Sequence, residues 1–306
     1  MIRYVLMVLV GAASFGILSS FVKLAYRQGY TTPEVAFIQA LLGAIVLWSI
    51  VFFTNKESRK SKGSRKPKEI GWLLVTGATI GITTFLYYLS VKYIPASIAI
   101  VLLMQFSWIG ILLEWLLYGK KPLKMELIVT AVVIFGTLMA SGIDLNQSNS
   151  LSLKGVGFVL LASLIYSIYI ILNSKTGKEG NWQNRSAWIM TGSALSILIL
   201  NFQPIVFSNH LDLHLLKWGL FLSVFGTILP PALFAVGIPK VGVTTSGLLM
   251  TVELPVAVLT ANLVLGENIT FVQIIGILIM IAAIIAMNLK KEKPLNENKE
   301  ELDSYV

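Results

Sequence analysis

One carboxylate, that of Glu253, stands near the middle of a long apolar stretch, residues 244–265. It is nine residues from Thr244, which corresponds to about 14 Å along a helix at a rise of 1.5 Å per residue. If the stretch crosses a membrane, a carboxylate there costs at least about 2.5 kcal/mol and must be neutral, paired or in contact with water. It could exchange a proton, bind the ammonium or hydroxyl of a ligand, or act structurally as a protonated acid bonded to a neighbouring helix.

Three prolines interrupt apolar stretches of this kind. Pro255 removes the N–H that would bond the carbonyl of Thr251, and Pro230 with Pro231 remove two donors from the stretch 217–238. Freed carbonyls are tolerated inside a bilayer only where protein or a wet cavity satisfies them. We therefore predict helix breaks or gating points at the prolines and place Thr251 at a cavity. A packing kink is the alternative.

Further polar side chains within apolar stretches are candidates for the same cavity. Tyr166 and Tyr169 share one helical face at i, i+3 spacing, and an aromatic ring with a hydroxyl suits an amphipathic ligand. Aromatic residues at the membrane interface are the alternative explanation for such tyrosines. The candidate substrate-binding residues are Glu253, Gln105, Thr83, Thr84, Tyr87, Tyr166, Tyr169 and Thr251.

Enzyme chemistry finds little support. The chain has no cysteine, which excludes thiolate nucleophiles, disulfides and cysteine-ligated metals. His210 and His214 have a metal-pair spacing beside Asp212, but no third strong ligand is near, so we expect a solvated loop. No lysine stands in a glycine-rich phosphate loop, which argues against ATP-driven pumping. We predict a protein that is not an enzyme and has no metal or cofactor.

Ten apolar stretches of bilayer length must position these residues. A helix needs roughly 20 apolar residues to cross the hydrocarbon core. The mean hydropathy of +0.78, with 56% hydrophobic and 13% charged residues, leaves too little polar surface for a soluble globule. We predict an all-α integral membrane protein with ten transmembrane helices, at 4–24, 33–54, 70–91, 95–117, 125–143, 155–174, 186–207, 217–238, 244–265 and 271–289.

The basic residues predict the orientation. With the N-terminus in the cytoplasm, 19 of the 24 Lys and Arg residues, Arg185 among them, fall in cytoplasmic loops and tails, and 5 fall outside. The positive-inside rule then predicts a multi-pass protein of the cell membrane with both termini cytoplasmic. The net charge of +9 thus indicates no nucleic-acid partner. The seven bases between Lys56 and Lys68 are interpreted first as a solvated orientation signal, and anionic lipids at the cytoplasmic surface are the partner that they would bind.

An internal repeat organises the chain. The fourth and ninth stretches align without gaps at an offset of 147 residues, which pairs Leu112 with Leu259 and Gly119 with Gly266. A unit of five spans has an odd number of crossings, so its second copy enters the membrane from the opposite side. We predict two inverted five-helix repeats, 1–144 and 145–290, and a cytoplasmic tail, 291–306. At the same offset, Thr83 and Thr84 match Pro230 and Pro231, so we expect these four residues to surround one site.

The second copy also carries a family resemblance. The segment Glu253-Leu-Pro255-Val, followed by Leu263-Val-Leu-Gly266-Glu267 and Gln273-Ile-Ile-Gly276, resembles the end of an EamA domain of the drug/metabolite transporter superfamily. The resemblance covers essentially the whole chain as two tandem EamA repeats. It implies a ten-helix carrier, usually an exporter of small metabolites, with a central cavity lined by helices one, three, four, six, eight and nine.

We therefore expect a secondary transporter that exports small metabolites such as amino acids by alternating access through a cavity between the repeats. An exporter of drugs or hydrophobic cations is the alternative. A channel or receptor-like membrane module is a third reading, although no pore ring or ligand domain is evident. Gly77 and Gly81 form a face of small residues that suits packing within the chain or in a dimer, so both a monomer and a homodimer stay open.

Overall fold

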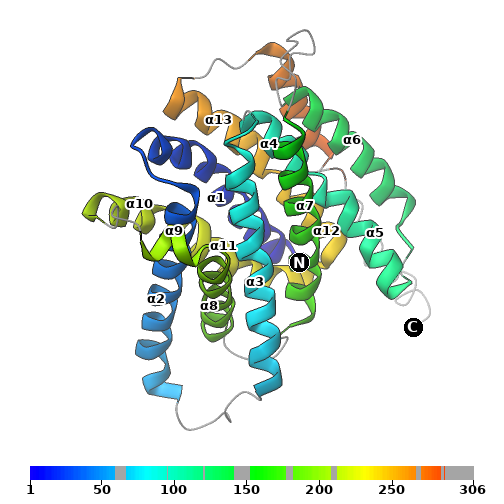
Figure 1. Cartoon of the computed structure of the whole chain (residues 1–306). Coiled ribbons are helices and arrows are strands. Elements are labelled where there is room, and N and C mark those ends of the chain that lie inside the picture. Colours follow the sequence, from blue (N-terminus) through cyan, green and yellow to red (C-terminus); the bar gives the residue numbers. More distant parts are fainter. Residues whose placement is uncertain are drawn as a thin grey trace, which may run out of the picture.

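The computed structural model describes residues 1–58, 67–94, 96–119, 121–140, 152–176, 182–207, 212–266, 270–283 and 286 (Figure 1). Within these residues every regular element is a helix, as predicted. The helices are α1 (Ile2–Arg27), α2 (Thr32–Ser58), α3 (Pro67–Ser90), α4 (Ala96–Leu103), α5 (Phe106–Tyr118), α6 (Lys124–Ala140), α7 (Leu153–Lys175), α8 (Trp182–Leu200), α9 (Phe202–Val206), α10 (Leu213–Ser223), the π-turn η1 (Val224–Ile228), α11 (Leu229–Val241), α12 (Val243–Met250) and α13 (Glu253–Leu265). A further apolar helix spans Phe271–Ala283.

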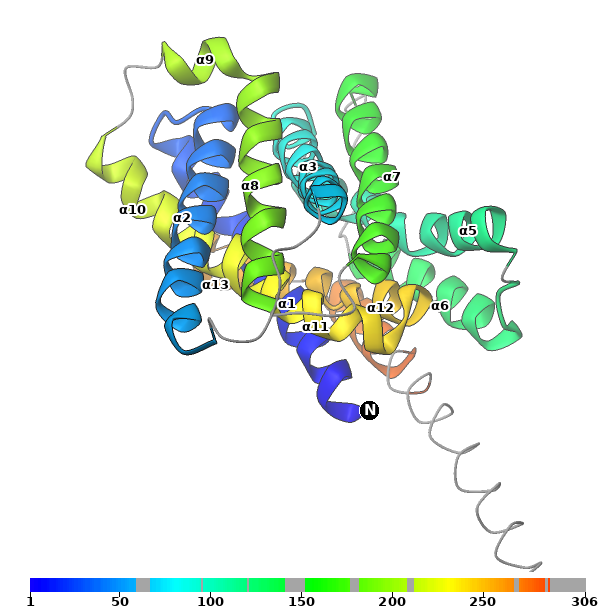
Figure 2. The ribbon, with the colours of Figure 1, turned by 90° about the horizontal axis from the view of Figure 1, so that it is seen from below.

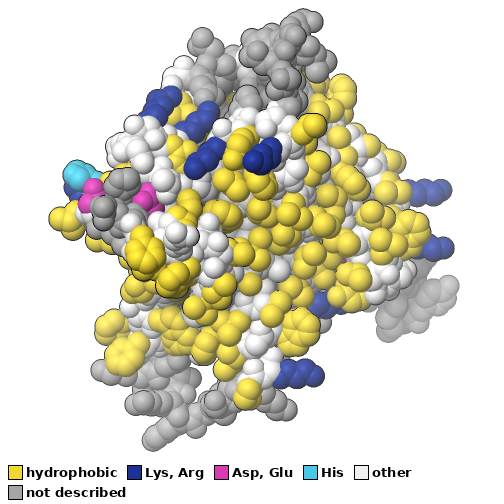
Figure 3. Space-filling model, viewed as in Figure 1, with side chains coloured by type: hydrophobic (Ala, Val, Ile, Leu, Met, Phe, Trp, Pro, Cys, Tyr) yellow, Lys and Arg dark blue, Asp and Glu magenta, His cyan; other side chains and the backbone are white. Residues whose placement is uncertain are grey.

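The outside of the helix assembly is apolar. Among the described residues, six helical segments are long and apolar enough to cross a membrane, at Ile2–Arg27, Thr32–Phe53, Pro67–Ser90, Leu153–Lys175, Leu213–Val241 and Thr245–Leu265. Figure 3 shows hydrophobic side chains over most of one face, with Lys and Arg toward its margins. Exposed apolar surface of this extent is what a multi-pass membrane protein presents to lipid.

The two predicted spans that the repeat pairs are broken rather than continuous. The span expected over 95–117 is divided into α4 and α5, and the span expected over 244–265 is divided into α12 and α13. The bounds of the first pair, shifted by 147 residues, coincide with those of the second. At the breaks, Ser107 N–H bonds the Met104 carbonyl and Leu254 N–H bonds the Thr251 carbonyl, both at 3.1 Å. The offset found in the sequence therefore also holds for local helix geometry.

The interruption expected at Pro230 and Pro231 takes the form of a π-turn. η1 lies directly before α11, and both prolines fall in the first turn of α11. Because proline has no N–H to donate, carbonyls in the preceding turn need other donors. The Ser14 hydroxyl of α1 donates to one of them, the carbonyl of Phe225. The π-turn thus binds α10 and α11 to α1.

Glycines let the helices approach closely. α8 lies between α2 and α3, as Figure 2 shows from below. A Cβ atom at Gly77 would overlap the backbone of Ile189 in α8, and one at Gly192 would overlap the carbonyl of Leu74 in α3. The face of small residues on α3 therefore packs within the chain.

Helix α1 packs between α11 and α13. A Cβ atom at Gly11 would stand 2.6 Å from the ring of Phe234 in α11. One at Gly16 would stand 2.5 Å from the backbone oxygen of Glu253, the first residue of α13. The absence of a side chain at Gly16 therefore brings the Glu253 segment directly against α1.

Arg185 corrects one part of the charge count. The count assigns it to a cytoplasmic loop, but it lies in the first turn of α8 and is only 2% exposed. Its guanidinium donates to the side chain of Asn173 in α7 at 2.6 Å, to the backbone of the same residue, and to the carbonyl of Ala235 in α11 at 2.6 Å. Arg185 therefore ties three helices together and is a buried helical residue rather than a loop residue.

Candidate functional site

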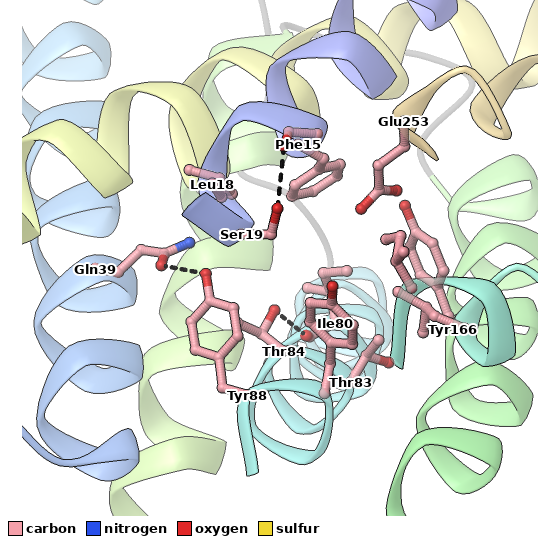
Figure 4. Close-up of a pocket in the computed structure, with 14 residues that line it drawn as sticks. Phe15, Leu18, Ser19, Gln39, Ile80, Thr83, Thr84, Tyr88, Tyr166 and Glu253 are labelled. Atoms are coloured by element: carbon pink, nitrogen blue, oxygen red, sulfur yellow. Dashed lines mark hydrogen bonds between the residues drawn. The ribbon is translucent and has the colours of Figure 1, made fainter. Parts of the chain in front are cut away.

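A pocket lies where α1, α2, α3, α4, α7 and α13 meet (Figure 4). Its volume is about 40 Å³, which is room for a few water molecules at about 10–15 Å³ each. The lining combines aromatic rings, small and branched apolar residues, hydroxyls, one amide and one carboxylate. It consists of Phe15, Gly16, Leu18, Ser19, Gln39, Ile80, Thr83, Thr84, Tyr87, Tyr88, Ile100, Leu103, Tyr166 and Glu253.

Glu253 supplies the charge in this lining. The break after α12 puts it in the first turn of α13, where the helix dipole favours a negative group. The residue is 6% exposed, and its carboxylate points into the pocket between Phe15 and Tyr166. Within the described part of the chain, Oε2 has no hydrogen-bond partner. An acceptor this deeply buried and unsatisfied calls for a donor from a ligand or water.

Two tyrosine hydroxyls share this lack of partners. The OH groups of Tyr87 and Tyr166 are buried and, among the described residues, accept and donate no hydrogen bond. Tyr166 is held by aromatic contacts, edge-on to Phe106 with ring centroids 4.7 Å apart and stacked on Tyr169 at 5.9 Å. These contacts fix the Tyr166 ring while leaving its hydroxyl available on the Glu253 side of the pocket, as Figure 4 shows.

The amide of Gln39 is a pocket residue that the sequence-based set does not contain. Gln39 lies in α2 and is 1% exposed, and its Oε1 accepts a hydrogen bond of 3.0 Å from the Tyr88 hydroxyl. It carries the same signal that selected Gln105, an amide inside an apolar span. Only the packing of the helices distinguishes the amide that lines the pocket from the one that does not.

Five of the eight predicted substrate-binding residues line this one pocket: Glu253, Thr83, Thr84, Tyr87 and Tyr166. The two threonine hydroxyls donate to carbonyls of their own helix, Thr83 to Thr79 at 2.8 Å and Thr84 to Ile80 at 3.0 Å. Their oxygen lone pairs can still accept from a ligand.

The other three lie outside the lining. Gln105 sits at the break between α4 and α5, where its Oε1 accepts from the indole of Trp108 at 2.7 Å. Tyr169 is fully buried one turn behind Tyr166. Thr251 is fully buried, and its hydroxyl donates to the carbonyl of Leu248 at 2.7 Å. The carbonyl of Thr251 that Pro255 would leave unbonded accepts from Leu254 instead.

The prolines are buried but do not line the pocket. The lining of this pocket includes Thr83 and Thr84 but neither Pro230 nor Pro231, so a site shared by all four residues stays a prediction. The eighth predicted span contributes no lining residue, while the second span contributes Gln39.

Of the predicted solvated loop, His210 lies outside the described residues, and His214 lies in the first turn of α10 rather than in a loop. Asp212 caps α10 by accepting from Leu215 N–H at 2.7 Å, and it also accepts from the Tyr30 hydroxyl at 2.9 Å. These two hydrogen bonds lower the pKa of the Asp212 carboxyl below its usual value. In the described residues, no three His, Cys, Asp or Glu side chains are grouped as a metal site would require.

Known proteins of similar sequence are transporters. The threonine/homoserine exporter RhtA of Salmonella typhimurium strain LT2 is 29% identical over 255 residues, which cover 82% of this chain and 80% of the relative. RhtA of Escherichia coli K12 is 28% identical over 271 residues, 87% and 85% of the two chains. The uncharacterized transporter YcbK of Bacillus subtilis is 22% identical over 283 residues, 88% and 87%.

The fold also has a counterpart among solved structures. One crystal structure matches with a TM-score of 0.71 over 92% of this chain and 96% of its own, at 13% sequence identity. The EamA-like transporter family matches twice in tandem, over residues 2–142 and 153–289. The two matches leave only short segments of the chain uncovered, and the resemblance noted in the sequence is confirmed. This chain therefore belongs to the EamA-like transporter family and is a transporter rather than an enzyme.

Proposed function

We propose that this protein is a secondary transporter that exports small amino acids, binding them beside Glu253 and moving them by alternating access. The observation that carries the proposal is the buried carboxylate of Glu253, which faces a pocket inside a membrane-crossing segment and whose Oε2 lacks a hydrogen-bond partner among the described residues. The two RhtA relatives are named as exporters of threonine and homoserine, which supports the same class of cargo.

An ammonium is the substrate group that suits Glu253. It supplies three N–H donors and the opposite charge, so it satisfies a carboxylate that would otherwise be costly at this depth. The hydroxyls of Tyr87 and Tyr166, buried and without partners in the described chain, offer further hydrogen bonds to the same ligand. When no substrate is bound, a proton on Glu253 would neutralise the carboxylate, or a water molecule would hydrogen-bond it. Such a proton would be the ion that is coupled to transport.

Alternating access fits the burial of the pocket lining. Thr83, Tyr166 and Glu253 are each at most 6% exposed, so the surrounding helices must separate for an amino acid to reach them. We propose that ten spans, arranged as inverted repeats over 1–144 and 145–290, make that separation possible on either side in turn. In this arrangement both termini and the tail 291–306 lie in the cytoplasm of a cell membrane.

Counterflow into proteoliposomes tests the proposal. Vesicles loaded with unlabelled threonine should accumulate labelled threonine transiently, which a carrier does and a channel does not. Glu253→Gln keeps the side-chain shape but removes the charge. Losing a charge-assisted hydrogen bond worth about 1.5–3 kcal/mol should weaken transport by roughly tenfold or more. Glu69→Gln, at an exposed position in the first turn of α3, is the matched control. Full transport by Glu253→Gln would remove this carboxylate from the mechanism.

An exporter of hydrophobic cations is the second candidate. The rings of Phe15, Tyr88 and Tyr166 in the same lining as Glu253 are what an organic cation binds well. Competition of tetraphenylphosphonium against labelled threonine distinguishes the two. We expect unlabelled threonine to compete and the cation not to, because tetraphenylphosphonium has no N–H group to donate to the Glu253 carboxylate.

A further inference from the structure

The pocket has a second polar end, formed by the carboxamide of Gln39. Figure 4 shows Gln39 and Glu253 on opposite sides of the lining, with the aromatic rings between them. The Oε1 of Gln39 is occupied by the Tyr88 hydroxyl. The orientation of the amide therefore leaves the Nε2 hydrogens as the donors that Gln39 can offer to a ligand.

Neighbouring backbone holds this amide in place. The backbone oxygen of Gln39 accepts from the Thr227 hydroxyl at 3.2 Å, and Thr227 belongs to the π-turn η1. The residue before it, Gly226, leaves the space that the amide occupies, since a Cβ there would stand 2.5 Å from Nε2. π-turns are frequent at functional sites because they re-aim side chains locally. Here the π-turn supports the Gln39 amide from behind.

The two ends of the pocket differ in chemistry. Glu253 is an acceptor with a negative charge, whereas Gln39 presents neutral N–H donors, and the lining contains neither lysine nor arginine. A substrate that matches both ends has an ammonium and, separate from it, a hydrogen-bond acceptor such as a carboxylate. A neutral donor also fails to retain anions that lack an ammonium, because no full positive charge is present to replace their hydration.

We infer that Gln39 is a specificity-determining residue: its amide N–H groups bind the carboxylate of a zwitterionic amino acid whose ammonium binds Glu253. This inference rests on the proposed function and deepens it. It assigns the selection of amino acids over simple amines to one side chain of α2, aimed by Tyr88 and the π-turn.

Competition in the counterflow assay tests this assignment. Unlabelled threonine is compared with 1-amino-2-propanol, which has the same hydroxyl and amine but no carboxylate. In the wild type we expect threonine to compete at least tenfold better, as a hydrogen bond to a charged group implies. Gln39→Met keeps the side-chain length and removes the donors. The apparent affinity for threonine should therefore fall until the ratio of the two apparent affinities, threonine over amine, approaches one, while the affinity for the amine stays unchanged. Gln203→Met, exposed in α9, is the matched control and should keep the wild-type ratio.

A second variant tests the same role of Gln39 if the Gln39→Met protein does not reach the membrane. Gln39→Glu replaces the donors by a negative charge, which should repel the carboxylate and make the amine the better competitor. The role of Gln39 is overturned if the wild type binds threonine and the amine equally well, or if either variant keeps the wild-type ratio of their affinities. Both outcomes leave transport beside Glu253 intact. Absence of threonine counterflow in the wild type overturns the proposed function itself.

Discussion

Gly226→Ala is a perturbation that reaches the pocket without altering any residue that lines it. The added Cβ would lie 2.5 Å from Gln39 Nε2 and 2.6 Å from Leu18 Cδ1, whereas ordinary contacts begin at 3.4 Å. The amide must therefore move by 3.4 minus 2.5, or at least about 0.9 Å. Because the Cβ stands behind the amide, it would push the amide toward the ligand, and a hydrogen bond of about 2.9 Å cannot be compressed by that amount.

Gly226→Ala should weaken substrate binding rather than destabilise the fold. Both obstructing atoms are ends of flexible side chains, so the fold can yield. The lost hydrogen bond to a substrate carboxylate is worth about 1.5–3 kcal/mol, which is roughly 10- to 150-fold in the apparent affinity for threonine. The affinity for 1-amino-2-propanol should stay near the wild-type value.

The assay is inhibition of counterflow by each compound, with thermal unfolding of the detergent-solubilised protein measured in parallel. Gly71→Ala is the matched control, because a Cβ at Gly71 of α3 meets nothing within 4 Å. If Gly226→Ala retains full affinity for threonine, the amide does not bind the carboxylate from the position seen here. If the variant weakens both compounds equally, the effect is a general distortion and the reasoning also fails.

Three further predictions concern stability, pH and movement. Gly192→Ala should destabilise the protein by about 1–3 kcal/mol, because its Cβ meets the rigid backbone of Leu74 in α3. Thermal unfolding in detergent measures this loss, and a wild-type melting temperature would contradict the close packing of α3 on α8. The pKa of Asp212 is lowered in the folded state by Leu215 N–H and the Tyr30 hydroxyl, so its stabilising contribution is complete above the ordinary pKa of 3.8 and is lost as pH falls through the lower folded value. Asp212→Asn should remove that part of the acid dependence of unfolding, and an identical acid profile would argue against it. Single cysteines at Val91, after α3, and Val236, in α11, should change their maleimide accessibility in opposite senses when substrate is added; parallel changes would count against alternating access.

The amino-acid sequence by itself determines the class of this protein. The length and number of its apolar stretches specify a helical membrane protein, because a backbone in lipid must satisfy its own hydrogen bonds. The offset of 147 residues identifies the repeat, and Glu253 stands out because a carboxylate within an apolar span demands an explanation. Pro255 indicates the break at Thr251, although the matching break at Gln105 has no proline.

Only the tertiary structure decides which polar residues share the pocket. In a soluble helix the polar face shows which side points outward, but these spans are apolar all round, since one face meets lipid and the other meets neighbouring helices. Gln39 and Gln105 carry the same signal in the sequence, an amide within an apolar span, yet the prediction names only Gln105, which does not line the pocket. The prediction groups Pro230 with Thr83 on repeat register alone. The close approach of α1 to α13 at Gly16, and the π-turn that places Gly226 behind Gln39, arise from contacts between residues far apart in the chain. Those contacts select Glu253, Tyr166 and Gln39 as one site, because a pocket is a property of packed surfaces rather than of any single helix.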